Sequence, residues 1–229
     1  MNRRVRAQIE IGATVIVVST HLDDAVLSCY HALSAQATVV TVLAGIPTAA
    51  EPGSWDLETG VTDSRARVRE RLEEDLEALA LSGSRVVHLD LLDSQYAELP
   101  ETAAIATRLA PFVGPAERVL APAGIRNLDH KAVRDAVLSL RDDAILYADL
   151  PYALHPDYGR FELPAELGPR GEMVEHVLDE STVAEKLDAV SRYRTQVDQL
   201  TSHFGDVLNR ADLGREVTWL PLGAGRPPE

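Results

Sequence analysis

The chain has one cysteine, Cys29, among its 229 residues. A single thiol excludes an internal disulfide framework and a metal site built from several cysteines, and it suits a reducing compartment. The sequence also lacks an apolar run of the ~20 residues needed to cross a bilayer. Its basic start, residues 1–6, is followed by Gln8 and Glu10 rather than by the apolar stretch of a signal peptide. These absences predict a soluble, cytoplasmic protein without a membrane span.

The chain is also poor in basic residues. It has 22 Lys and Arg and 36 Asp and Glu, which gives a formal net charge of -14. So acidic a surface repels nucleic-acid phosphates and anionic headgroups, which disfavours both as partners. The ordinary effect of such a charge is solubility. With 45% hydrophobic residues, the chain is long enough to bury one large core, so we expect a single domain over residues 1–229.

Apolar runs of strand type alternate with helical patterns along the chain. The expected strands are at residues 13–19, 38–43, 85–89, 118–121 and 144–147. The expected helices are at residues 23–35, 63–81, 101–113, 129–140 and 183–200. This alternation predicts an α/β, Rossmann-like three-layer sandwich with a mostly parallel central sheet.

Three segments fall outside the alternation. Residues 44–60 form a loop long enough to serve as a lid, and residues 151–180 are irregular; we expect both to recognise the substrate. Residues 223–229 have the composition of a disordered tail.

The helix expected at 63–81 has clear ends. Thr62 or Asp63 is a suitable cap, and Gly83 a suitable stop. Its predicted buried stripe consists of Val68, Leu72, Leu76, Leu79 and Ala80.

Polar clusters follow the first and fourth expected strands. Their members are His21, Asp23, Asp24, Asn127, Asp129 and His130. Ligands of open α/β sheets bind outside the carboxyl ends of the strands, so the clusters should meet at one edge. A catalytic zinc takes three N or O ligands and keeps one position open, which His21, Asp24 and His130 could satisfy. Asp23 would remain beside the metal as a general base for water.

A simpler explanation exists for each cluster. Asp23, Asp24 and Asp129 begin helices, where acidic residues cap free N–H groups, and His21 could be a hydrogen-bonded histidine at a strand end. The coincidence of both clusters at strand ends favours a metal hydrolase, but residue types and spacing leave both interpretations open.

The same residues resemble the signatures of a known family. His21-Leu22-Asp23-Asp24 is similar to the His-Pro-Asp-Asp motif of LmbE-like, or PIG-L, deacetylases. Asn127-Leu128-Asp129-His130 resembles their second motif, His-x-Asp-His. Residues 22–29, 149–153 and 193–196 are similar to a bacterial branch, so the resemblance covers roughly residues 12–200.

The resemblance implies an N-deacetylase that uses Zn²⁺, or another divalent metal such as Fe²⁺, on an amino sugar or sugar-containing metabolite. It assigns the metal to His21, Asp24 and His130. It makes Asp23 the general base and Asp129 an acidic residue that supports the second motif. Arg71 lies where the family has an arginine near the substrate, although a solvated helix charge would explain it equally, and Tyr152 is a further candidate for substrate contact. The expected partner is a small N-acetylated molecule, and the oligomeric state stays open.

Asn127 is the main departure, because the family has a histidine there that stabilises the oxyanion or serves as an acid. Asparagine donates a neutral N–H but cannot shuttle a proton. Either an amide meets the oxyanion role, or another residue such as Tyr152 supplies the donor, or activity is weak.

Other functions remain to be weighed. An amidase for a non-sugar N-acyl substrate would use the same residues, and a degenerate relative would keep only the metal. A nucleotide-binding protein is disfavoured, because the turn after the first strand reads Thr20-His21-Leu22-Asp23 instead of Gly-x-Gly-x-x-Gly.

The remaining histidines carry less signal. We expect His31 and His176 in helices as structural residues, His88 at the rim of the sheet and His155 in a surface loop. Cys29 is expected to be a buried small residue rather than a nucleophile.

Overall fold

The structure, a computed structural model, describes residues 14–155 and 160–223. The basic start of the chain lies outside the described residues, as does all of the expected tail except Gly223.

One sheet of seven strands crosses the described part of the chain in the order β3-β2-β1-β4-β5-β7-β6. Its strands are β1 (Val15–Ser19), β2 (Ala37–Thr41), β3 (Arg85–His88), β4 (Arg118–Pro122), β5 (Ile145–Tyr147), β6 (Met173–Val177) and β7 (Arg215–Trp219). From β3 to β5 neighbouring strands are parallel, whereas β7 runs antiparallel to both β5 and β6. The expected mostly parallel sheet is confirmed, with β6 and β7 as an antiparallel extension that the sequence did not predict.

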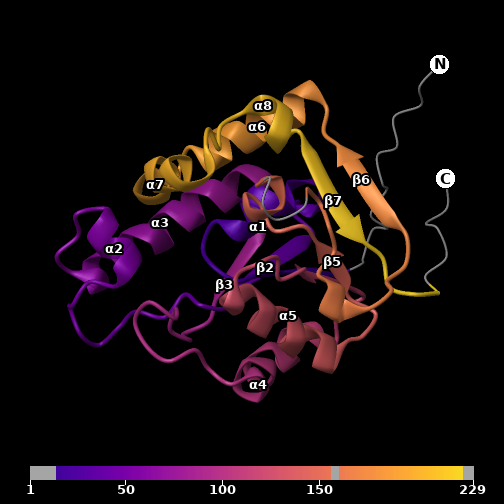
Figure 1. Ribbon diagram of the computed structural model, residues 1–229, viewed down its shortest axis with the longest axis horizontal. Coiled ribbons are helices and arrows are strands. Elements are labelled where there is room, and N and C mark those ends of the chain that lie inside the picture. The colour runs from indigo at the N-terminus through magenta and orange to yellow at the C-terminus, as the bar shows by residue number, and fades with distance from the viewer. Residues whose placement is uncertain (1–13, 156–159, 224–229) are drawn as a thin grey trace.

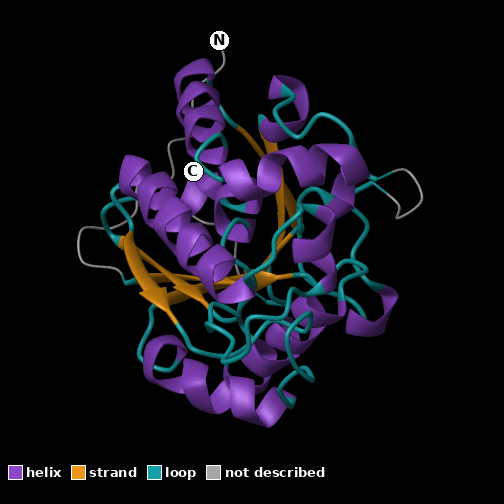
Figure 2. Cartoon of the chain, turned by 90° about the vertical axis from the view of Figure 1, so that its left-hand side faces the viewer, coloured by secondary structure: helices purple, strands orange, loops and turns teal. Residues whose placement is uncertain are grey.

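Helices cover both faces of this sheet (Figures 1 and 2). On one side lie α4 (Thr102–Val113) and α5 (Leu128–Leu140); on the other lie α3 (Ser64–Ser82), α6 (Glu180–Val190) and α7 (Arg194–Phe204). Because both faces are covered, β1 is buried at every residue, which explains its near-continuous run of β-branched side chains. The short helices are α1 (Asp24–Ser28), α2 (Ser54–Glu58) and α8 (Arg210–Leu213), with 3-10 turns η1 (Tyr30–Ala32), η2 (Tyr152–Leu154) and η4 (Ala165–Leu167). Within residues 14–155 and 160–223, no helix has the length and apolarity needed to cross a membrane.

The helix expected after the first strand is broken into α1 and η1. The cause is Glu216 of β7, whose buried carboxylate accepts the backbone N–H groups of Tyr30 at 2.8 Å and His31 at 2.9 Å. These two N–H groups therefore bond to a distant side chain instead of continuing α1.

The helix expected at 183–200 is likewise two helices. Glu74 of α3 accepts the backbone N–H of Thr195 at 3.1 Å and its hydroxyl at 2.8 Å, so α7 begins anew on a carboxylate from another helix. Between α6 and α7, the buried Tyr193 hydroxyl donates to Asp75 of α3 at 2.8 Å.

Helix α3 has the predicted ends, because the Asp63 side chain accepts the N–H groups of Arg65 and Ala66 and the helix stops before Gly83. The predicted apolar stripe is partly wrong. Leu76 is 50% exposed, and Ala80 is exposed as well. The charged side chains that this helix buries instead are Arg71, Glu74 and Asp75. They are buried because α7, the 44–60 segment and the loop after β3 supply polar partners on that face.

The two segments predicted to be a loop and an irregular stretch contain helical turns and a strand. Helix α2 lies inside residues 44–60, and η2, η4 and β6 lie inside 151–180. His176 therefore belongs to strand β6 and not to a helix, and His31 lies in the 3-10 turn η1.

Candidate active site

A cavity of about 290 Å³ lies at the carboxyl ends of the parallel strands. Its walls come from the segments that follow each of the strands β1 to β5 and from the helices α2, α3 and α7. The two motif-bearing loops follow β1 and β4, which are adjacent in the sheet. This is the point where the strand order reverses, and such a switch point opens a crevice for ligands.

His21, Asp24 and His130 meet at this point, as the sequence predicted. Asp24 Oδ2 lies 3.3 Å from His21 Nδ1 and 3.2 Å from His130 Nε2. The two histidine nitrogens are themselves 3.2 Å apart. These three atoms form a nearly equilateral group, which could hold one metal ion.

The other nitrogen of each histidine bonds to a carboxylate. His130 Nδ1 lies 2.7 Å from Asp149 Oδ1, and His21 Nε2 lies 3.2 Å from Asp129 Oδ2. A carboxylate there holds the ring proton on the outer nitrogen, so the lone pairs of His21 Nδ1 and His130 Nε2 face each other and Asp24. A tetrahedral ion with bonds of about 2.0–2.1 Å separates its ligand atoms by about 3.3–3.4 Å, close to the spacing seen here. The three residues fit a divalent metal.

Without a metal ion, each ionisable group of this site shifts the pKa of its neighbours. Burial alone would raise the pKa of Asp24, but the charge of His130 and the hydrogen bond from His21 lower it to about 2. Burial opposes protonation of His21, yet Asp129 and Asp24 hold its pKa well above the usual value. The group therefore concentrates negative charge on Asp24.

Asp23 lines the cavity beside these residues and is 6% exposed. It occupies the cap position of α1, but within the described chain its carboxylate makes no cap hydrogen bond. Burial, together with the negative charge of Asp24, raises the pKa of Asp23 to about 7. Such a carboxylate can exchange a proton near neutral pH, which helix capping would not require.

Asn127, and not Asp129, caps α5. Asn127 Oδ1 accepts the N–H groups of Asp129 at 2.8 Å and His130 at 3.3 Å. The Asp129 carboxylate is thereby left for His21 and for the Ser94 hydroxyl, which donates to it at 2.9 Å. The capping explanation for Asp129 is wrong.

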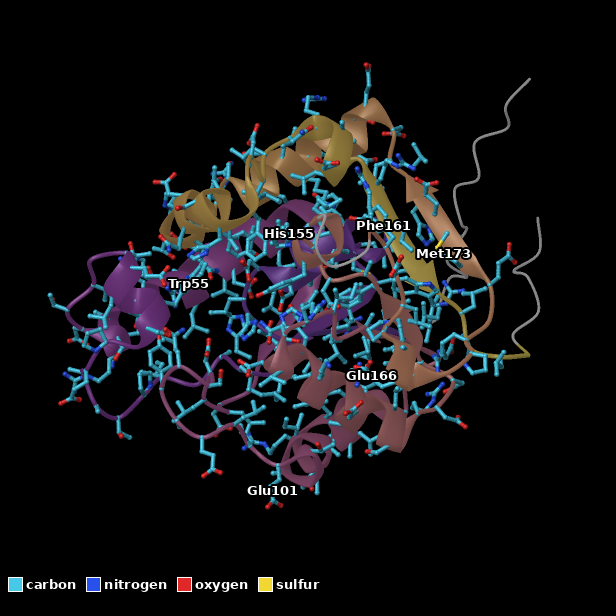
Figure 3. All side chains as sticks on the ribbon, viewed as in Figure 1. Trp55, Glu101, His155, Phe161, Glu166 and Met173 are labelled. Carbon is cyan, nitrogen blue, oxygen red and sulfur yellow. The ribbon has the colours of Figure 1, made fainter. Side chains whose placement is uncertain are left out.

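Arg71 lines the cavity but is 5% exposed, so it is not a solvated helix charge. Its Nη2 lies 3.1 Å from Asp56 Oδ1 of α2, a close ion pair rather than an aligned hydrogen bond. The Tyr96 hydroxyl donates to the other oxygen of Asp56 at 2.8 Å. Trp55, also of α2 and labelled in Figure 3, stacks on His203 of α7 with ring centroids 5.3 Å apart.

Sequence reasoning missed several residues of this site. They are Asp56, Asp93, Ser94, Tyr96 and, as the partner of His130, Asp149. Asp149 alone had a signal, since it lies in a stretch with a family resemblance; the others come from loops without a local pattern.

The remaining histidines have structural partners. His88 Nε2 lies 2.7 Å from Asp75 Oδ2, and His31 stacks on His176 with centroids 3.7 Å apart. Cys29 is buried, as expected.

No family model and no curated protein sequence matches the chain. Solved structures do. A triple mutant of the deacetylase Orf2 of the teicoplanin biosynthetic pathway is 28% identical over 93% of this chain and 100% of its own, with a TM-score of 0.76. The A40926 pseudoaglycone deacetylase Dbv21 is 29% identical over 94% of this chain and 99% of its own, with a TM-score of 0.77.

Two further structures extend the comparison. The zinc-inhibited form of the teicoplanin deacetylase is 26% identical over 92% of this chain and 99% of its own, with a TM-score of 0.73. At 16% identity over 86% of this chain and 76% of its own, the N,N'-diacetylchitobiose deacetylase from Pyrococcus horikoshii shares the fold, with a TM-score of 0.54. The deacetylases above 25% identity match nearly the whole chain, and its strand ends bring together the His-Asp-His group that both signature motifs require. The chain thus resembles the LmbE-like, or PIG-L, deacetylases in its fold and in both motifs, and it is a metal-dependent N-deacetylase.

Proposed function

We propose that this chain removes an N-acetyl or related N-acyl group from a small sugar-containing metabolite. In this proposal Zn²⁺, or another divalent ion such as Fe²⁺, is held by His21, Asp24 and His130. The observation that carries the proposal is the group of three ligand atoms 3.2–3.3 Å apart, with the Asp23 carboxylate beside it in one cavity. The similarity to deacetylases of teicoplanin and of the A40926 pseudoaglycone supports the reaction and the substrate class.

Side chains of the chain itself carry out the proton transfers and orient the groups that would hold the metal. A divalent ion at this site would polarise the amide carbonyl and ease ionisation of water. Asp23 accepts one proton from the water that attacks the carbonyl carbon. The same proton then passes to the nitrogen as the C–N bond breaks, so the products are a carboxylic acid, which keeps the second water proton, and a free amine. Asp129 holds His21 in the tautomer that presents Nδ1.

The cavity walls support a small polar substrate. About 290 Å³ lies at the lower end of the range for small-molecule sites. Arg71 and Tyr152 line the cavity together with Trp55, so a cation, a hydroxyl and an indole are all available to a sugar conjugate. We assign substrate contact to Arg71 and Tyr152 on this basis.

The proposal is tested by screening metal-replete protein against N-acetyl sugars, sugar conjugates and simple N-acyl amines, with amine release as the readout. We expect release from the sugar-containing members, loss of release after chelation, and about one metal ion per chain by elemental analysis. Release confined to non-sugar amides would overturn the substrate class, and no release at all would overturn the reaction.

Asp23→Asn tests the general base. The variant should keep its metal and lose turnover by about 10²–10⁴-fold, because the amide accepts no proton. Asp143→Asn is the matched control, since Asp143 is exposed and pairs with Arg141. Wild-type turnover in Asp23→Asn would remove Asp23 from the mechanism.

A further inference from the structure

The side-chain amide of Asn127 has a fixed orientation. Two backbone N–H groups, those of Asp129 and His130, point at Oδ1, and an N–H can only donate. Oδ1 therefore faces the first turn of α5. The amide nitrogen faces the opposite way, where Nδ2 donates to the Tyr152 hydroxyl oxygen at 2.9 Å.

This contact decides where the Tyr152 proton points. Because the phenol oxygen accepts from Asn127, its own O–H is directed away from Asn127, and Tyr152 is one of the residues that line the cavity. The ring is held edge-on between His130 and Phe204, at centroid distances of 5.4 Å and 5.1 Å. Burial raises the pKa of Tyr152 to about 12, so the phenol stays a neutral donor.

From this geometry we infer that the Tyr152 hydroxyl is the oxyanion donor of the reaction and that Asn127 is its positioning residue. The inference rests on the proposed function and deepens it. In the resembling family, a histidine at the position of Asn127 has the oxyanion role. Here we assign that role to Tyr152 as the donor and to Asn127 as the residue that orients it. One of the two Nδ2 hydrogens of Asn127 is committed to Tyr152, and the inference assigns the oxyanion to the Tyr152 hydroxyl rather than to the other Nδ2 hydrogen.

The step balances without a proton from Tyr152. As water adds to the amide carbon, the carbonyl π pair moves onto oxygen and one water proton goes to Asp23. The oxygen, now negative, accepts a hydrogen bond from Tyr152, which keeps its proton. When the C–N bond breaks, the pair returns to form the carboxyl group, and the Asp23 proton goes to the amine. A donor aimed in advance at the developing charge needs no reorganisation.

Tyr152→Phe removes only the hydroxyl. We expect kcat to fall about 10²–10³-fold with KM changed less than threefold, the usual effect of losing one oxyanion donor. Tyr30→Phe is the matched control, since it removes a buried hydroxyl outside the cavity lining and should leave kcat unchanged. Wild-type kcat in Tyr152→Phe, or loss of its bound metal, would overturn the inference.

Two variants of Asn127 separate positioning from helix capping. Asn127→Ser keeps a cap oxygen but cannot reach Tyr152, and Asn127→Asp keeps the cap but accepts the Tyr152 proton, turning it away from the cavity. Both should lower kcat, the second nearly as much as Tyr152→Phe. The double variant with Asn127→Ser and Tyr152→Phe should have a kcat less than threefold below that of Tyr152→Phe alone, because both changes remove the same donor. Additive losses in kcat would show that Asn127 acts on structure alone.

Binding of methylphosphonate, a tetrahedral anion, gives a readout without turnover. Calorimetry on metal-loaded protein should show a Kd at least tenfold weaker in Tyr152→Phe than in wild type or Tyr30→Phe. Equal affinity in all three would remove Tyr152 from the anion site. Wild-type protein that binds methylphosphonate but releases no amine would instead count against the proposed function.

Discussion

His130 and Asp149 share a hydrogen bond of 2.7 Å between Nδ1 and Oδ1, with both side chains fully buried. The second oxygen of Asp149 accepts the backbone N–H of Ile125 at 2.8 Å. One carboxylate thus orients the histidine and also fixes the loop that carries Asn127. Because its two oxygens have two different donors, no neutral side chain of the same shape can replace it.

Asp149→Asn tests this double role. An amide offers one acceptor and one donor, so either His130 or Ile125 would face an N–H group instead of an oxygen. We expect metal affinity to fall 10–100-fold, measured by metal titration against a competing chelator. Asp143→Asn, at an exposed ion pair, should bind as the wild type does. Unchanged affinity in Asp149→Asn would show that His130 needs no partner to hold its tautomer.

Asp56→Ala tests how α2 is held over the cavity. The change leaves Arg71 buried without its anion and Tyr96 without its acceptor, which should destabilise the docked segment by about 3–5 kcal/mol. Hydrogen exchange at residues 54–58 should accelerate accordingly. Glu58→Ala is the control from the same helix, since its pair with His203 is half exposed and should contribute less than about 1 kcal/mol. Equal exchange in both variants would mean that other contacts hold α2.

The parallel half of the sheet was predictable because burial on both faces leaves its signature in the sequence. Val15–Ser19 and Ala37–Thr41 are β-branched runs, and the helices between strands have caps that can be read locally. Strands β6 and β7 were not predictable in this way. Met173–Val177 alternates between exposed and half-buried residues over only five positions, without a matching alternation of apolar and polar types, and its partner Arg215–Trp219 lies some forty residues further along. Pairing, and not local pattern, makes them strands.

The same distinction between local pattern and distant pairing applies to the residues of the site. His21, Asp24 and His130 could be found because strand ends converge by topology, whichever side chains they carry. Asp56 and Ser94 could not, since each becomes significant only through a partner 15–35 residues away. The breaks after α1 and α6 have the same cause, because Glu216 and Glu74 reach from distant elements to take backbone N–H groups.

Acid should destabilise the fold through His176. Burial, with the nearby charge of His31, lowers the pKa of His176 to about 4, while Thr218 Oγ1 bonds to its Nε2 at 2.9 Å. The unfolded chain binds a proton at a pKa near 6.5. Between pH 6.5 and 4 the unfolded state therefore holds more protons, and the free energy of unfolding falls as the pH falls.

His176→Gln removes this titration and keeps a hydrogen-bonding side chain. Over the same interval the variant should lose less stability than wild type, by roughly 1–2 kcal/mol after allowance for partial exposure. Denaturant unfolding at a series of pH values measures the difference. Parallel stability curves for the two proteins would show that other groups, among them the buried Glu216 that faces this pair, carry the acid sensitivity.

Gly124 lies in the loop after β4, against the first turns of the helix that carries His130. It has φ +77°, and a Cβ there would lie 2.8 Å from Arg134 Nη1 and 3.0 Å from Lys131 Cα, the residue after His130. Gly60 has a similar φ of +71° with no heavy atom within 4 Å of a Cβ. Gly60→Ala should therefore lower the free energy of unfolding only through the strain of a left-handed backbone conformation, by about 1–2 kcal/mol.

Gly124→Ala adds a steric clash to the same backbone strain. Arg134 Nη1 already donates to the Ala123 carbonyl at 3.0 Å, so the arginine cannot swing away freely and the first turn of α5 must shift. We expect Gly124→Ala to be less stable than Gly60→Ala by at least about 1 kcal/mol in denaturant unfolding. Its metal affinity should fall as well, since His130 moves with Lys131, whereas Gly60→Ala should keep wild-type affinity. Equal stability and equal metal binding in the two variants would mean that the loop after β4 can yield without disturbing His130.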